Sequence, residues 1–302
     1  MKRLPNYSLL WVSFIVFLCT SCNPASQLAV SSPDGNLCLH VETENGKLYY
    51  ELSRNGKPIL DKSRLGFILK EDTLADHLEI TEALHHSFSG TWEQIWGEDR
   101  IVENNYHEMT IHVQETSAHK RKFKVVFRLF NDGFGFRYEF PVQEALKDFV
   151  IMDELTEFAL TGDHKAWSIP HEAHFYEALY EASPVSKLGW VSTPLTMETN
   201  DGLFLSIHEA NLTDYAAMNL IPKEGSMTLK ANLTPWSTGE KVFMKAPGVT
   251  PWRTMIVAES VGDLLLSRLM LNLNEPCRIQ NTSWLQPGRY IGIWWTYHMH
   301  KH

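Results

Sequence analysis

The feature that most constrains the fold of this chain is a period of two in its hydrophobic pattern, interrupted by short turn sequences. Between residues 122 and 140, apolar side chains alternate with polar ones on both sides of Asn131-Asp132-Gly133. A glycine there accepts the positive φ that a tight turn requires, so this segment predicts a β-hairpin. The same arrangement recurs around Asn45-Gly46, Asn55-Gly56 and Asn200-Asp201-Gly202. Regularly spaced strands separated by turns are typical of an antiparallel β-sandwich.

One stretch departs from this pattern. The apolar spacing from Val261 to Leu269 predicts a short helix, and Ser260 is placed to serve as its N-cap. No internal repeat, low-complexity tract or linker divides the sequence. A single large all-β sandwich is therefore the simplest interpretation of the 302 residues.

The composition, with 44% hydrophobic and 21% charged residues, is that of a globular protein. The formal net charge is −9. Because an acidic surface repels phosphate backbones, the sequence argues against nucleic acid as a partner.

The first 22 residues predict a lipoprotein-type signal peptide. Lys2 and Arg3 precede an apolar stretch that is shorter than the roughly 20 residues of a membrane-spanning helix, and small residues lead to Cys22, the predicted lipidation site. Cys19 stands where such sites usually carry an aliphatic residue, so ordinary signal cleavage a few residues later is the alternative. Either way we expect an exported protein, held in the periplasm or at the outer membrane of a bacterium, with the lipid as its membrane anchor.

The two remaining cysteines, Cys38 and Cys277, would lie in an oxidising compartment where a disulfide can form. Both have apolar sequence neighbours, so two buried free thiols are at least as plausible as a bridge.

Several histidine and tryptophan patterns have structural explanations. The histidines of His171-Glu-Ala-His174 are three residues apart in a β-rich region, whereas zinc proteases need a spacing of four on a helix. His298, His300 and His302 could share one face of an extended tail, but chain ends are usually disordered, so we expect no metal there. The 10 tryptophans could include sugar-stacking platforms, although for any one of them we favour the core.

Seven segments, taken together and in order, resemble glycoside hydrolase family 97. They are Trp92–Glu98, Arg128–Pro141, Gly162–Trp167, Asp201–Ala210, Thr250–Thr254, Leu271–Pro276 and Tyr290–Trp295.

The resemblance implies a large antiparallel β-super-sandwich of the galactose-mutarotase-like kind over residues 28–280. Residues 281–302 would then be a linker and a truncated first strand of a (β/α)8 barrel. Tyr290–Trp295 has the continuous apolar character of a strand buried on both faces. The family's general acid and its base or nucleophile lie on later barrel strands, so the resemblance implies no catalytic residue in this chain.

The resemblance also implies one metal ligand. In the family a sandwich glutamate reaches the active site and helps to hold calcium, and the matching position here is Glu177. Calcium prefers six to eight oxygen ligands, so Glu177 alone cannot form a tight site and would bind calcium only with a barrel partner. For Glu209, in another family-like segment, we expect a structural role.

The function that follows from the resemblance is that of an N-terminal, carbohydrate-associated domain of an α-glycoside hydrolase, without the catalytic barrel. One alternative is a calcium-dependent α-glucosidase or α-galactosidase completed by a separately encoded barrel. Another is a stand-alone lipoprotein that binds carbohydrate. In each case the expected ligand is an α-linked oligosaccharide.

Overall fold

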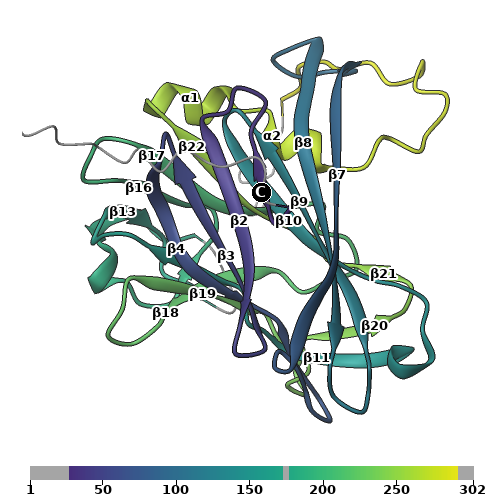
Figure 1. Ribbon diagram of the computed structural model, residues 1–302. Coiled ribbons are helices and arrows are strands. Elements are labelled where there is room, and N and C mark those ends of the chain that lie inside the picture. The colour runs from purple at the N-terminus through teal and green to yellow at the C-terminus, as the bar shows by residue number, and fades with distance from the viewer. Residues whose placement is uncertain (1–26, 173–176, 292–302) are drawn as a thin grey trace, which may run out of the picture.

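The computed structural model describes residues 27–172 and 177–291 (Figure 1). It confirms the predicted all-β architecture, because the described strands pair only antiparallel and form three sheets. The eight-stranded sheet consists, in spatial order, of β1 (Ala29–Ser31), β2 (Leu37–Glu44), β3 (Lys47–Arg54), β4 (Lys57–Leu65), β12 (Glu157–Leu160), β19 (Thr228–Leu233), β18 (Met218–Pro222) and β15 (Val191–Ser192).

The second large sheet packs against the first. It consists of β14 (Glu181–Pro184), β13 (Lys165–Ser168), β16 (Leu195–Glu198), β17 (Phe204–Ala210), β22 (Trp252–Ala258), β10 (Gly133–Phe140), β9 (Lys122–Phe130), β8 (Ile101–Glu115) and β7 (Leu78–Glu93), with β21 (Gly248–Val249) paired to β10. A small sheet consists of β20 (Val242–Lys245), β11 (Asp148–Glu154), β5 (Phe67–Leu69) and β6 (Thr73–Leu74).

The predicted hairpins form where the turn residues indicated. Glu44 lies opposite Lys47, and the two residues between them, Asn45 and Gly46, have φ values of 52° and 73°. Such a two-residue turn matches the right-handed twist of the strands that it joins. In the β9–β10 hairpin, Phe130 lies opposite Gly133, so the glycine begins the second strand.

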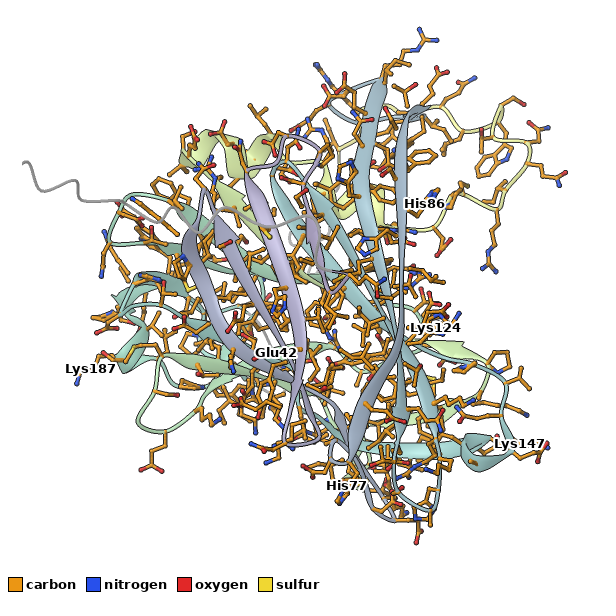
Figure 2. The ribbon with its side chains drawn as sticks, viewed as in Figure 1. Glu42, His77, His86, Lys124, Lys147 and Lys187 are labelled. Atoms are coloured by element: carbon orange, nitrogen blue, oxygen red, sulfur yellow. The ribbon has the colours of Figure 1, made fainter. Side chains whose placement is uncertain are left out.

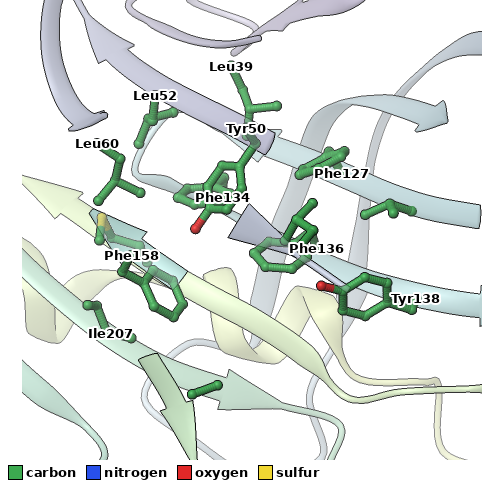
Figure 3. Close-up of a cluster of buried hydrophobic side chains, with 14 of the residues drawn as sticks. Leu39, Tyr50, Leu52, Leu60, Phe127, Phe134, Phe136, Tyr138, Phe158 and Ile207 are labelled. Carbon is green, nitrogen blue, oxygen red and sulfur yellow. The ribbon is translucent and has the colours of Figure 1, made fainter. Parts of the chain in front are cut away.

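The core lies between the two large sheets and is rich in aromatic side chains (Figure 3). Tyr50 of β3 packs 5.2 Å, centroid to centroid, from Phe136 of β10. The hydroxyl of Tyr50 donates to the Glu157 carbonyl at 2.8 Å, and that of Tyr138 lies 3.0 Å from Thr156 Oγ1. Both buried tyrosines therefore add apolar area while their polar ends stay hydrogen-bonded.

The helical region differs from the prediction in its length. The chain forms two short helices, α1 (Val261–Leu266) and α2 (Leu269–Leu273), with an extended residue, Ser267, between them. Ser260 caps α1 as predicted, accepting a hydrogen bond from the Asp263 amide. Only α2 has an apolar face against the sheet. Among the described residues no helix is long and apolar enough to cross a bilayer.

Two expectations about buried residues were wrong. Cys277 is an exposed free thiol, so there is no bridge between it and Cys38. Of the tryptophans that the structure describes, Trp252 is fully buried, but five are exposed, namely Trp92, Trp96, Trp190, Trp236 and Trp284. The core is filled by phenylalanine, tyrosine and aliphatic side chains, while lysines such as Lys147 and Lys187 cover the outer surface (Figure 2).

Candidate functional site

Glu177 lies in the connection between β13 and β14, at one edge of the ten-stranded sheet. The base of this connection is fixed by a β-bridge between Pro170 and Val191 and by a hydrogen bond from the His171 amide to the Trp190 carbonyl. The imidazole of His171 also packs on the indole of Trp190, with 4.3 Å between ring centroids. This packing gives His171 a structural role. The Glu177 side chain is exposed beyond this fixed base.

The described residues do not by themselves make a calcium site. A carboxylate supplies at most two of the six to eight oxygens that calcium prefers. No group of three or more histidine, cysteine, aspartate or glutamate side chains in the described part of the chain is arranged to hold a metal ion. Glu177 therefore cannot hold a calcium ion with the other described residues alone.

Other predicted positions lie outside the described residues. These are Cys22, His174, most of Tyr290–Trp295, and the histidines at 298, 300 and 302. Tyr290 and Ile291 are described and are almost fully exposed, outside any strand.

A second feature is an apolar surface on the distal half of the β7–β8 hairpin. This hairpin reaches past the sandwich beside the C-terminal segment (Figure 1). Its exposed apolar side chains that line one groove, which we call the hairpin surface, are Phe88, Trp92, Ile95 and Trp96. Trp96, at its tip, is 71% exposed.

The hairpin surface borders a groove of about 620 Å³. One wall contains Phe88, Trp92 and Trp96, and the other is the segment from Leu271 to Cys277. Trp92 Nε1 donates to Asn272 Oδ1 at 2.9 Å, and Asn272 Nδ2 donates to the Glu103 carbonyl at 2.8 Å. These bonds attach α2 to both strands of the hairpin, so the groove is a defined part of the fold.

A buried ionic network links the sheets. Arg253 of β22 donates to both carboxylate oxygens of Glu154, at 2.8 and 2.7 Å, and to Glu209 Oε2 at 2.6 Å. Thr156 and Tyr215 complete the hydrogen bonding of Glu154, and the Met218 amide donates to Glu209. The structural role expected for Glu209 is consistent with these contacts, because both its oxygens are engaged within the fold.

Burial is the largest single influence on the pKa values of both carboxylates, and acting alone it would raise each of them. At Glu154 the charge and the paired hydrogen bonds of Arg253 outweigh burial, so its pKa lies below its ordinary value. At Glu209 burial prevails and the pKa is raised despite Arg253. Neither group is available to a sugar, because Arg253 and its neighbours occupy them.

The hairpin surface was not predicted from the sequence, although Trp92–Glu98 is one of the seven family-like segments. The signal was present in that segment, where two tryptophans and an isoleucine occur within five residues next to charged ones. Exposed aromatic residues gathered at one place commonly mark a binding surface.

Comparisons with known proteins agree with this architecture. A sequence model of the family described as Glycosyl-hydrolase 97 N-terminal matches residues 30–276. A retaining alpha-galactosidase of Bacteroides thetaiotaomicron is 25% identical over 92% of this chain and 46% of its own length. A probable retaining alpha-galactosidase of Streptomyces bingchenggensis is 25% identical over 88% of this chain and 40% of its own length.

Solved structures give the same picture. A glycoside hydrolase family 97 enzyme from Pseudoalteromonas sp. strain K8, solved in complex with acarbose and, as a variant, with panose, is 38% identical. It superposes with a TM-score of 0.86 over 90% of this chain and 41% of its own. The chain thus spans less than half the length of these relatives.

Proposed function

Because this chain belongs to glycoside hydrolase family 97, through the N-terminal domain of that family, we propose that it is the non-catalytic half of an α-glycosidase. In this proposal a (β/α)8 barrel docks on the sandwich and supplies the acid and base. Glycoside hydrolysis needs two carboxyl groups positioned on either side of the scissile bond. The buried carboxylates of Glu154 and Glu209 are both held by Arg253 inside the fold.

The hairpin surface carries the proposal. Its four apolar side chains are clustered and accessible, and they adjoin the segment that leads out of the sandwich toward residue 291. A contiguous exposed apolar patch is unfavourable in water and typically marks an interface. A domain that follows the sandwich in the same or an associated polypeptide would emerge next to this patch and could cover it.

We propose α-linked oligosaccharides as the substrate class. The curated relatives are named alpha-galactosidases, and the Pseudoalteromonas enzyme was solved with acarbose and panose. In this proposal Glu177 adds one carboxylate to a calcium ion held by the barrel, which its exposed place beyond the β13–β14 base allows.

Export as a lipoprotein is part of the same proposal. It is supported by Lys2, Arg3, the following apolar stretch and Cys22. Metabolic labelling with palmitate tests it: the full chain should be labelled and Cys22→Ala should not. Equal labelling of both would contradict lipidation at Cys22.

The docking proposal is tested by co-purification. The chain is co-expressed with the tagged barrel half of the Pseudoalteromonas enzyme, and we expect the two to purify together. Trp96→Ser and Phe88→Ser should weaken this association. Trp236→Ser, which changes an equally exposed tryptophan on the β19–β20 connection, is the matched control and should not. Undiminished co-purification of the hairpin variants would contradict a barrel docked there.

A further inference from the structure

A cavity of about 550 Å³ lies among turns of the sandwich, and none of its lining residues belongs to the hairpin surface. Three connections form it. They are the β3–β4 turn with Arg54 and Lys57, the β12–β13 connection with His164, and the β16–β17 turn with Asn200 and Asp201. The first turn belongs to the eight-stranded sheet and the third to the ten-stranded sheet, so the cavity opens between the two layers.

His164 is the unusual member of this lining. It is only 4% exposed, yet neither Nδ1 nor Nε2 has a hydrogen-bond partner in the described part of the chain. Its backbone is fixed, since the Val185 amide donates to the His164 carbonyl at 2.9 Å. Burial lowers the pKa of the imidazole, which is therefore neutral and offers one donor and one acceptor. Buried polar atoms are normally hydrogen-bonded, so the two ring nitrogens of His164 lack the partners expected of them.

The surrounding groups supply further donors and acceptors. A Cβ at Gly162 would lie 2.9 Å from His164 Cε1 and 3.4 Å from Asn200 Nδ2, so the bare glycine lets the imidazole and the amide lie near one another. Asp201 is fixed by a 2.6 Å hydrogen bond from Thr199 Oγ1. That bond first, then a backbone hydrogen bond and the charge of Lys57, lower the pKa of Asp201, which is a carboxylate acceptor.

The charges around the cavity are balanced. Arg54 is paired with Glu259, and Lys57 is close enough to Asp201 to influence it. A site for an anion would present an excess of positive charge. This cavity instead presents closely spaced hydrogen-bond donors and acceptors, some neutral and some of opposite charge. Such groups suit a ligand with adjacent hydroxyl groups, because each hydroxyl can both donate and accept a hydrogen bond.

We infer that this cavity binds a neutral polyhydroxylated ligand of the pyranose class, with His164 as the buried recognition residue and Asn200, Asp201 and Lys57 around it. This would be an auxiliary sugar site. Strand β13 separates it from Glu177, because Lys165 at one end pairs with Glu198 beside the β16–β17 turn, whereas Ser168 at the other pairs with Glu181. Its existence does not depend on a docked barrel.

Histidine-detected NMR on the full chain tests the inference. Methyl α-D-glucopyranoside and methyl α-D-galactopyranoside are added separately to protein labelled at the histidine rings. We expect a saturable shift of the His164 ring signals with at least one sugar, while exposed His86 on β7 does not move (Figure 2). Asn200→Ala and Lys57→Met should each weaken binding by about three- to tenfold, the effect of losing one hydrogen bond.

Lys47→Met is the matched control, because Lys47 lies at the opposite end of β3 from the cavity and should leave the affinity unchanged. Lys57 is exposed, so its variant leaves the core intact. Two results would overturn the inference. One is a His164 signal that stays still up to about 100 mM of either sugar, a concentration well above the millimolar range of weak specific sites. The other is a shift produced by inorganic phosphate and not by the sugars.

Discussion

Arg253 and Glu154 are both completely buried, and they are joined by two hydrogen bonds, Nε to Oε1 at 2.8 Å and Nη2 to Oε2 at 2.7 Å. Arg253 lies on β22 of the ten-stranded sheet and Glu154 at the end of β11 in the small sheet. The pair therefore fixes two sheets relative to each other. Glu209 takes the remaining guanidinium edge, so the network contains one cation and two carboxylates.

Removing the arginine should be severely destabilising. Arg253→Met leaves two carboxylates buried without a counter-ion, and breaking a buried pair in this way costs about 3–5 kcal/mol. The free energy of unfolding, measured by urea denaturation, should fall by that order. As the matched control, Lys62→Met removes an exposed pairing with Glu42 and Glu44 and should leave stability unchanged within error. An equally small effect of both variants would show that the network adds nothing to the fold.

Gly133 should tolerate no side chain. Its φ is 152°, and a Cβ there would lie 2.3 Å from the Met255 carbonyl oxygen on β22. We expect Gly133→Ala to destabilise the chain by more than about 2 kcal/mol, because both the backbone strain and the clash must be relieved. Gly225 also has a positive φ, 71°, but a Cβ there would meet no atom within 4 Å. Gly225→Ala therefore isolates the backbone strain from any clash and should cost about 1 kcal/mol of stability. Thermal unfolding of both variants measures the difference, and equal losses would contradict the predicted clash.

Gly133 also illustrates how far the sequence determines the fold. Alternation on both sides of Asn131-Asp132-Gly133 was enough to predict the β9–β10 hairpin, because a period of two and a turn residue are local properties. The close approach of β22 to Gly133 is not local, since β22 is more than a hundred residues away in sequence. For the same reason, the strand order within the sheets could not be predicted from the sequence.

The stability of the chain should fall as the pH is lowered through 6.5. Burial lowers the pKa values of His164, His171 and His208 from that ordinary value. The unfolded chain then binds protons that the folded chain does not, so stability is full above pH 6.5 and is lost as the pH falls toward the folded-state values. We expect the Tm to drop by roughly a few °C between about pH 7.5 and 5.5.

His164→Asn should reduce that pH-dependence, whereas His86→Asn, at an exposed position on β7, should leave it as it was. A pH-dependence of the Tm that is the same in His164→Asn as in the wild-type chain would contradict the assignment of His164 as a buried neutral histidine.

The isolated chain should associate through its hairpin surface. Trp96 is 71% exposed, and Phe88 and Ile95 line the same groove. Apolar surface of this kind drives self-association when its partner is absent. Sedimentation velocity should show concentration-dependent oligomers that Trp96→Ser diminishes without a loss of Tm. A strictly monomeric wild-type chain at high concentration would contradict an uncovered interface.

Less of the candidate site than of the fold could be predicted from the sequence. The position of Glu177 came from resemblance, and the structure adds that its side chain is exposed beyond a base fixed by Pro170 and Val191. The hairpin surface and the His164 cavity were not predicted. Burial of tryptophan is a statistical preference, and only the packed structure reveals that the distal half of β7 leaves the sandwich and exposes Trp92 and Trp96.

Hydrolysis by the purified chain itself is the most direct test of a non-catalytic sandwich. The chain is incubated with 4-nitrophenyl α-D-galactopyranoside, with the corresponding α-glucoside and with maltose, in the presence of calcium. We predict no release of 4-nitrophenol or glucose above the uncatalysed rate, because Arg253 holds the buried carboxylates of Glu154 and Glu209 and, in our proposal, the acid and base belong to the barrel. Saturable turnover that Glu177→Gln abolishes would contradict it, since the chain would then contain chemistry that we assign to the barrel.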